Sequence, residues 1–316
     1  MPAATSSPPG APTLSRRPRR ARARRRDTTS AYVLLAPALA LLAVWFLYPI
    51  VSSFLLSVQA VNVFHYSQRT WVGLANFQRL LSDPVFRSTI RITLTFVLIV
   101  VPAQTVLALL AAVLVRGLRR LRTFYRTALF VPYVTSTVAV TAVFMDLFTV
   151  HSALPVFFSR LGLADVSWFA DVHLALPFLA MIYVWMNLGL YMVIFLSGLQ
   201  TVPAELYEAA RVDGAGAVHE LLFITVPSLR PFVLFVVISG MIGAFQIFDQ
   251  AYVVSGGTVL GGPAGATSTI VIFIFAQAFR YNKLGSASAA AVLFLVVVSL
   301  ATLVMRRIFR EETRAA

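Results

Sequence analysis

Long apolar runs constrain this chain more than any other feature of its sequence. Six of them are near or above the ~20 residues that an α-helix needs to cross a lipid bilayer. They are Ala31–Val58, Ile92–Val115, Thr127–Val150, Leu174–Leu199, Pro231–Val254 and Ala287–Met305. With 59% hydrophobic and only 12% charged residues, the chain is too apolar for a soluble domain. The runs predict an all-α integral membrane protein with six transmembrane helices.

The basic residues predict which side of the membrane each end occupies. Nineteen lie in the N-terminal tail, the 116–126 loop, the 203–227 loop with its Arg230 flank, and the segment after Met305. Seven lie in the remaining loops. Basic residues accumulate on the cytoplasmic side, so both termini and the 203–227 loop are expected in the cytoplasm. This topology explains the net charge of +14 better than nucleic-acid binding does.

The chain divides into three parts on composition. Residues 1–30 are rich in Pro, Ala, Ser and Arg without an apolar face, which predicts a disordered basic tail. A membrane domain is expected over 31–310, followed by a short cytoplasmic tail over 311–316. The sequence has no cysteine, and its four histidines show no i,i+4 pairing. Disulfides and thiolate sites are therefore excluded, and a metal site is not expected.

One stretch, Pro203–Pro227, is polar and helix-forming in an otherwise apolar chain. Pro203 suits the first position of a helix, and Glu205 and Glu208 lie near the end where negative charge is favourable. Gly214 is a plausible stop, forming a corner that we expect a side chain to obstruct. A second helical pattern then runs into the next apolar run. This elbow is either an amphipathic connector between spans or a surface that a partner grips.

The elbow resembles the EAA signature of binding-protein-dependent ABC importer permeases, in which this loop docks in a groove on the ATPase subunit. One departure is Val226, where the family usually has Leu. The resemblance implies a six-helix permease fold with cytoplasmic coupling helices, and it assigns ATPase coupling to a set of elbow residues. These residues are Glu208, Ala209, Ala210, Asp213, Gly214, Ile224 and Pro227.

Other segments resemble the first-subunit, F-type permeases for carbohydrates. Trp71–Phe77 is similar to their W-x-G-L-x-N-F stretch, and Arg126–Pro132 to the R-T-x-x-F-x-P that opens their third span. Gly261-Gly262-Pro263 and the residues after it are similar to the same group. For Trp71–Phe77, interfacial anchoring by aromatic residues is the alternative interpretation.

The resemblance also implies partners and a location. We expect a second homologous, G-type permease subunit, two ATPase subunits that hold ATP and Mg²⁺, an extracellular solute-binding protein, and the lipid of a bacterial inner membrane. We expect no cofactor in this chain. Gly257 and Gly262 are spaced like the ends of a phosphate loop, but Pro263 stands where its lysine would be. ATP must therefore be bound by another subunit.

Polar side chains within the apolar runs are costly and therefore informative. Asn187 lies near the middle of its run, and Gln246, Asp249 and Tyr252 recur every three residues, which predicts one shared helix face. Aromatic rings beside amide or carboxylate acceptors suit sugar binding, although hydrogen bonding between helices is the alternative. For Asp249, as for Asp146, a solvated position at the end of a span is a further alternative. The candidate pathway residues are Asn187, Tyr191, Phe245, Gln246, Asp249 and Tyr252.

These features predict a non-catalytic permease subunit for a sugar or related polyol. The alternative is a stand-alone ion-coupled secondary transporter, which should bury carboxylates at mid-span or show an internal hydropathy repeat. Neither is evident. The short apolar run Thr267–Phe279 is expected to form a re-entrant or interfacial helix, since it is too short to span comfortably.

Overall fold

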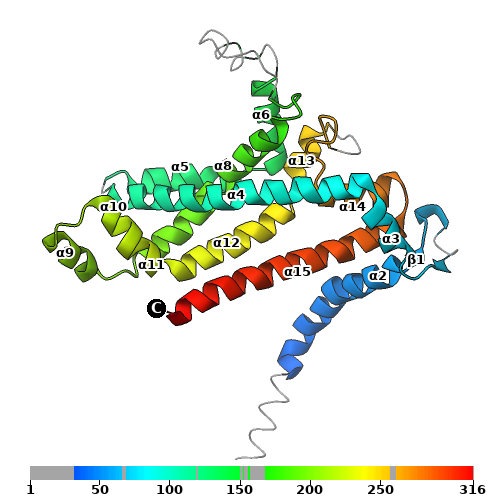
Figure 1. Cartoon of the computed structure of the whole chain (residues 1–316), viewed down its shortest axis with the longest axis horizontal. Coiled ribbons are helices and arrows are strands. Elements are labelled where there is room, and N and C mark those ends of the chain that lie inside the picture. Colours follow the sequence, from blue (N-terminus) through cyan, green and yellow to red (C-terminus); the bar gives the residue numbers. More distant parts are fainter. Residues whose placement is uncertain are drawn as a thin grey trace, which may run out of the picture. The chain divides into compact units, whose positions relative to one another are not determined.

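The computed structural model describes residues 32–65, 69–118, 120–149, 152, 156, 168–256 and 261–315, without the side chains of His65 and of residues after Ile308. The predicted tail over residues 1–30 lies outside the described residues. Within them, five helices are long and apolar enough to cross a membrane, and a bent pair makes a sixth if it counts as one span. The five are Tyr32–Ser57, Pro84–Gly117 (α4), Ala175–Leu199 (α8), Arg230–Val254 and Leu284–Ile308 (Figure 1).

The first of these helices begins in a separate compact unit that ends at Ser52. It contains a π-helical turn, Ala43–Leu47 (η1), and finishes as α2, Tyr48–Ser57. No residue in its most apolar window is buried within this chain. Such an all-round apolar surface is suited to lipid or to another membrane subunit.

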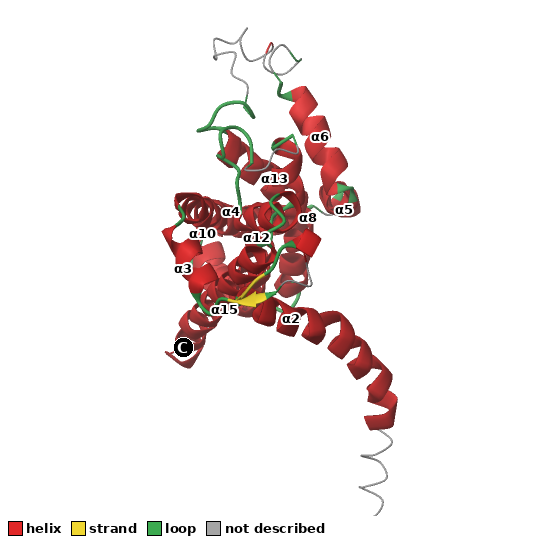
Figure 2. Ribbon diagram, turned by 90° about the vertical axis from the view of Figure 1, so that its right-hand side faces the viewer, coloured by secondary structure: helices red, strands yellow, loops and turns green. Residues whose placement is uncertain are grey.

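The second unit, Ser53–Ala316, is a helical bundle in which α4 packs against α8, α5 (Arg122–Val134) and α12 (Arg230–Phe245). The last helix, α15 (Leu284–Ala315), packs against α12. Figure 2 shows these helices after a turn of 90° about the vertical axis of Figure 1. Gly189 permits the close contact of α8 with α5, because a Cβ there would lie 2.1 Å from the Leu129 carbonyl oxygen.

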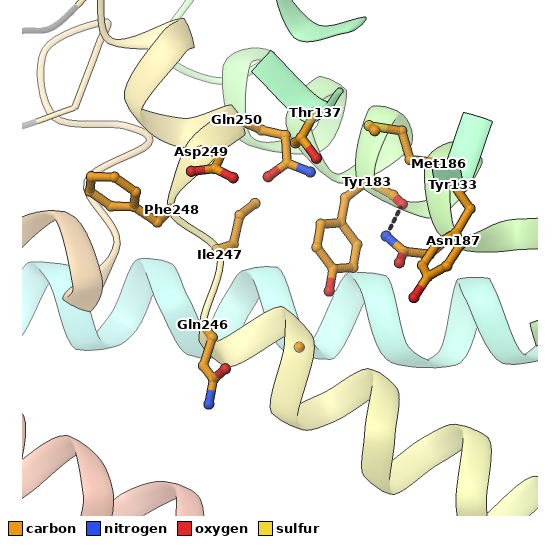
Figure 3. Close-up of a pocket in the computed structure, with 11 residues that line it drawn as sticks. Tyr133, Thr137, Tyr183, Met186, Asn187, Gln246, Ile247, Phe248, Asp249 and Gln250 are labelled. Atoms are coloured by element: carbon orange, nitrogen blue, oxygen red, sulfur yellow. Dashed lines mark hydrogen bonds between the residues drawn. The ribbon is translucent and has the colours of Figure 1, made fainter. Parts of the chain in front are cut away.

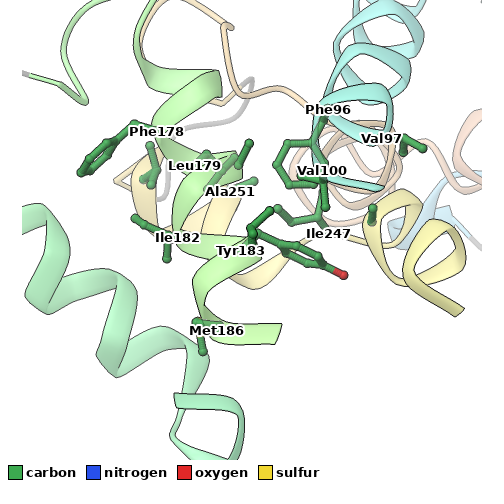
Figure 4. Packing of buried hydrophobic residues seen from close by; sticks show 14 of the residues in the cluster. Phe96, Val97, Val100, Phe178, Leu179, Ile182, Tyr183, Met186, Ile247 and Ala251 are labelled. Atoms are coloured by element: carbon green, nitrogen blue, oxygen red, sulfur yellow. The ribbon is translucent and has the colours of Figure 1, made fainter. Parts of the chain in front are cut away.

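Two apolar clusters lie along this bundle. The first packs Phe96 and Val100 of α4 against Ile182 and Tyr183 of α8 and Ile247 (Figure 4). The second lies nearer the elbow and also joins α4, α8 and α12. Its fully buried members are Ala108, Ala112, Met192, Phe195, Leu229 and Val236. Small alanines on α4 opposite large side chains on α8 bring these helices together.

Short elements close the end of the bundle that carries the Trp71–Phe77 motif. Strand β1 (Gln59–Ala60) pairs antiparallel with β2 (Thr70–Trp71), near the short 3₁₀ helix η2 (Val63–His65) and before α3 (Ala75–Ser82). Asn76 is 2% exposed and its Nδ2 donates to the carbonyls of Ser57 and Gln59, both at 2.9 Å. Trp71 is 71% exposed. Within this motif the asparagine is a structural tie, and interfacial anchoring remains an interpretation for the tryptophan.

Two of the predicted spans differ from the helices in the structure. Helix α4 begins at Pro84 rather than Ile92, because Asp83 caps it by accepting from the Val85 amide at 2.8 Å. The predicted third span, Thr127–Val150, is not one helix but α5 and α6 (Thr137–Leu147), bent by 96°. Pro132 removes one backbone hydrogen bond from the last turn of α5, which favours a break there.

The short apolar helix near the C-terminal part was predicted over Thr267–Phe279. It forms over Ile270–Arg280 as α14 (Ile270–Phe275) and the π-helical turn η4 (Ala276–Arg280). The helix α15 continues without interruption through the predicted boundary at residue 310.

Candidate functional site

The elbow has the predicted order of helix, glycine corner and helix. Helix α9 covers Ala204–Val212, and the second arm comprises α10 (Ala217–His219), the π-helical turn η3 (Glu220–Thr225) and α11 (Val226–Ser228). One residue, Leu229, separates the end of this arm from the start of α12.

Gly214 forms the corner for a reason that differs from the predicted one. A Cβ at this position would meet nothing within 4 Å, so a side chain would not be obstructed by neighbouring atoms. The backbone has φ of +81°, a left-handed conformation that glycine adopts without the cost other residues incur. Glycine is therefore needed at this position for its backbone conformation and not for lack of space.

The signature residues of the elbow gather around its inner corner. A cavity of 350 Å³ there is lined by Ala210, Asp213, Gly214, Ala215, His219 and Ile224. Glu208 lines a second cavity of 420 Å³, between α9 and the end of α4. Glu208, Ala209 and Pro227 are exposed in this chain, so they are accessible to another subunit. Whether they contact an ATPase stays a prediction.

Tyr207, which the sequence reasoning missed, joins the elbow to the membrane helices. Its ring is 8% exposed and lies beneath the Arg116 guanidinium, 5.0 Å from ring centroid to Cζ. Arg116 Nη1 donates to the Tyr207 hydroxyl at 3.3 Å, and that hydroxyl lies 3.0 Å from Thr225 Oγ1. Thr225 in turn donates to the Glu220 carbonyl at 3.1 Å. One buried tyrosine therefore connects α9 with α4 and with the second arm.

The two arms are also joined by an ion pair. Arg211 Nε donates to Glu220 Oε1 at 2.8 Å, and Nη2 to Oε2 at 3.4 Å. The Arg211 hydrogen bond lowers the pKa of the Glu220 carboxyl, while the same bond raises the pKa of Arg211. Because the pKa of the Glu220 carboxyl is lowered, the ion pair contributes fully to stability above the usual glutamate pKa. This contribution is lost as the pH falls through the lowered pKa.

A different cavity, of 350 Å³, lies within the membrane bundle (Figure 3). It forms where two helices are broken, at the α5–α6 bend and between α12 and α13 (Asp249–Val254). Residues of five helices and of the segment between α12 and α13 line it, and most of them are polar or aromatic. They are Tyr133, Thr137, Tyr183, Met186, Asn187, Gly243, Gln246, Ile247, Phe248, Asp249 and Gln250.

Three of the six predicted pathway residues line this cavity: Asn187, Gln246 and Asp249. Asn187 Nδ2 donates to the Tyr183 carbonyl of its own helix at 2.8 Å, as the dashed line in Figure 3 shows. Gln246 and Asp249 are exposed in the isolated chain. Asp146 is also exposed in the isolated chain, and its solvated position at the end of a span stays a prediction.

The other three predicted residues lie elsewhere. Tyr191 and Phe245 are buried in the two apolar clusters. Tyr252 stacks on Phe248 with centroids 5.3 Å apart. None of these three lines the cavity among the described residues.

The prediction that Gln246, Asp249 and Tyr252 share one helix face is wrong. Helix α12 ends at Phe245 and α13 begins at Asp249, so residues 246–248 interrupt the helical period. In Figure 3, Gln246 and Asp249 point in different directions from the break. The sequence reasoning also missed Tyr133, Thr137, Tyr183 and Gln250. Only the proline at 132 signals the first break, and no comparable signal marks the second.

Among the described residues, no group of three His, Asp or Glu side chains is placed to hold a metal ion. The polar and aromatic side chains of the cavity can form hydrogen bonds and ring contacts.

Comparison with known proteins shows which family the chain resembles. Residues 104–314 match the model of the family described as binding-protein-dependent transport system inner membrane component. The chain is 32% identical to the lactose transport system permease protein LacF of Rhizobium radiobacter over 292 residues, covering 90% of this chain and 95% of that protein. It is 31% identical to the arabinooligosaccharides transport system permease protein AraP of Bacillus subtilis, covering 86% of each chain.

The fold matches a solved transporter. A chain in the crystal structure of the bacterial alginate ABC transporter, in complex with an alginate pentasaccharide-bound periplasmic protein, superimposes with a TM-score of 0.79. The match covers 92% of this chain and 96% of that chain at 19% identity. The family match includes the elbow and every residue that lines the membrane cavity. This chain therefore belongs to the family of binding-protein-dependent transport system inner membrane components.

Proposed function

We propose that this chain is the F-type, first permease subunit of an ABC importer for a sugar or related polyol, delivered by an extracellular solute-binding protein. The observation that carries the proposal is the cavity at the two helix breaks, in a chain whose elbow has the order of helix, glycine corner and helix. Relatives named as lactose and arabinooligosaccharide permeases support the substrate class.

The cavity has the chemistry that a sugar requires. Tyr133, Tyr183 and Phe248 offer ring faces for the apolar faces of a pyranose. Asn187 and Asp249 offer hydrogen-bonding groups for its hydroxyls. Its volume of 350 Å³ lies within the range of small-molecule sites.

The proposed partners are inferred from the polar residues that this chain exposes and from the phosphate loop that its sequence cannot form. Gln246 and Asp249 are exposed in the isolated subunit, so a second homologous, G-type permease would enclose the substrate beside them. ATP and Mg²⁺ would be held by two ATPase subunits, because Pro263 replaces the lysine that a phosphate loop needs. The permease itself is non-catalytic.

The orientation is part of the proposal. The basic residues, nineteen against seven, support a location of both termini and the elbow in the cytoplasm of a bacterium, where the ATPase subunits would bind. The cavity then lies between the outer loops, where a solute-binding protein would dock, and the elbow.

Reconstitution tests this function. The complete complex in liposomes should take up labelled sugar only when ATP, both ATPase subunits and the loaded binding protein are supplied. A matched preparation lacking the binding protein should hydrolyse ATP without uptake. Uptake by this chain alone, driven by an ion gradient, would contradict the proposal.

A further inference from the structure

A hydroxyl from a distant loop holds the break between α12 and α13. Thr269 Oγ1 donates to the Ile247 carbonyl at 3.1 Å, and the exposed fractions of the two residues are 0% and 2%. Ile247 lies outside both helices, so neither helical ladder uses its carbonyl. A buried carbonyl without a partner is costly, and here Thr269 supplies the missing donor.

The Thr269 hydroxyl does not cap its own helix. It is the N-cap of α14, where a threonine hydroxyl ordinarily accepts from the first turn, yet its side chain makes no capping bond. The first amide of α14, Ile270 N, instead donates to Thr93 Oγ1 of α4 at 2.9 Å. Thr93 is itself 2% exposed and donates to the Thr89 carbonyl. Capping is thus transferred to α4, and the Thr269 hydroxyl is committed to the break.

These contacts form one buried node that joins three elements distant in sequence. The bonded pairs are 22 residues apart for Thr269 and Ile247, and 177 residues apart for Ile270 and Thr93. The loop that leads into the node is compact, because a Cβ on Gly261 would lie 2.4 Å from the Ser268 amide nitrogen. A shift of this loop would therefore be felt directly at the Ile247 carbonyl.

We propose that Thr269 and Thr93 are positioning residues that hold the α12–α13 break in the shape that places Gln246 and Asp249 in the lining of the substrate cavity. Through them, the outer loop 261–269 sets the geometry of the membrane cavity. The nature of the substrate rests on the proposed function, whereas the geometry of the break does not.

Transport kinetics of the reconstituted complex provide the first test. Thr269→Val keeps the shape and removes the donor, so the maximal uptake rate should fall about tenfold, equivalent to ~1.4 kcal/mol. The concentration of loaded binding protein at half-maximal rate should change less than about twofold. Thr269→Ser, which keeps the hydroxyl, should restore most of the rate.

Thr105→Val is the matched control. Thr105 is the same residue type on α4, and its hydroxyl donates to the Val101 carbonyl of its own helix at 2.7 Å, outside the cavity lining and the loop 261–269. The control should therefore transport at the wild-type rate. Equal uptake rates for the Thr269→Val and Thr105→Val complexes would overturn the proposal.

A second readout is independent of transport. The chain has no cysteine, so Gln246→Cys introduces a single thiol at the break. In a complex whose other subunits lack reactive thiols, Thr269→Val should change the labelling rate of this thiol by a small hydrophilic reagent by about threefold or more, and Thr105→Val should not. Unchanged labelling would overturn the proposal even if the transported substrate proved not to be a sugar. Failure of Thr269→Val to assemble would also overturn it, because the hydroxyl would then serve folding rather than positioning.

Discussion

Asn187 of α8 and Gln246, which lies in the break between α12 and α13, line the same cavity, and each carries an amide that can both donate and accept. Neither residue carries charge, so transport of a neutral solute needs no compensating ion at these two positions. At the elbow, Glu208 is exposed and charged, which suits an ionic contact with another subunit.

Replacing Asn187 or Gln246 with Leu should reduce uptake about threefold to tenfold, since each removes one polar contact with the substrate. Complex assembly should be unchanged by size-exclusion chromatography. Asp146→Asn is the control, because Asp146 is exposed and lies outside the cavity lining. Loss of assembly with normal transport by the residual complex would instead support a role in helix packing.

Glu208→Lys should weaken association with the ATPase subunits, because it places a positive charge where a basic groove is expected. Co-purification of the ATPase and ATP-driven uptake should both fall at least about tenfold. Glu205→Lys is the control on the same helix, one turn away, since Glu205 lines neither elbow cavity. Wild-type co-purification of the Glu208→Lys complex would leave the elbow as a connector only.

At the scale of elements, the elbow is a stiff unit rather than a loose loop. Its arms are tied by the Arg211–Glu220 ion pair and by Tyr207, which also ties them to the end of α4 through Arg116. A displacement of α9 would therefore move the end of α4 with it. The breaks in the α5–α6 pair and the α12–α13 pair are the corresponding irregular elements of the membrane cavity.

Tyr207→Phe tests this connection. The variant keeps the ring under Arg116 and loses the hydroxyl that reaches Thr225, so ATPase association should be retained while uptake per ATP hydrolysed falls about threefold to tenfold. Measuring uptake and phosphate release on the same proteoliposomes gives this ratio. A Tyr125→Phe control alters a tyrosine of α5 outside the elbow cavities. An unchanged ratio for Tyr207→Phe would show that its hydroxyl does not contribute to coupling.

Variants of Gly214 test whether the corner depends on its backbone conformation or on the open space beside it. Since the position is open but has φ of +81°, Gly214→Asn should retain most uptake, and Gly214→Val should lose most of it. Uptake by complexes normalised for permease content measures the difference. Equal loss with Asn and Val would indicate that the space beside Gly214 is needed by a partner.

For the molecule as a whole, the distribution of charge predicts the orientation in the membrane. In the proposed orientation, the elbow and the outer loop 261–269 lie at opposite faces, with the cavity between the helices that connect them. Such an arrangement would let ATPase motion at one face and binding-protein docking at the other act on the same broken helices.

A topology experiment checks this orientation. A reporter fused after Arg310 should read cytoplasmic, and one inserted near Ala264 should read external, because the basic residues divide nineteen to seven. Paired alkaline phosphatase and green fluorescent protein fusions at both sites provide the measurement. Reversal at both sites would contradict the six-span arrangement with cytoplasmic termini.

Local sequence determined the membrane class, the approximate spans and the elbow. Hydropathy requires only that ~20 neighbouring residues be apolar, and the corner at Gly214 follows from residues adjacent in the chain. For the same reason, Asn187 could be found as an amide in the middle of an apolar run. These properties depend on short stretches, which a sequence displays directly.

Only the tertiary structure decided where the helices break and which side chains meet. The α12–α13 break is stabilised by Thr269, and α14 is capped by Thr93, a residue 177 positions away from the amide it accepts. Tyr207 is buried because Arg116, 91 positions away, lies over its ring. A regular helical period cannot show an interruption that distant hydrogen bonds stabilise, which is why Gln246 and Asp249 were assigned to one face. The cavity exists because these long-range contacts satisfy backbone groups that the breaks leave without helical partners.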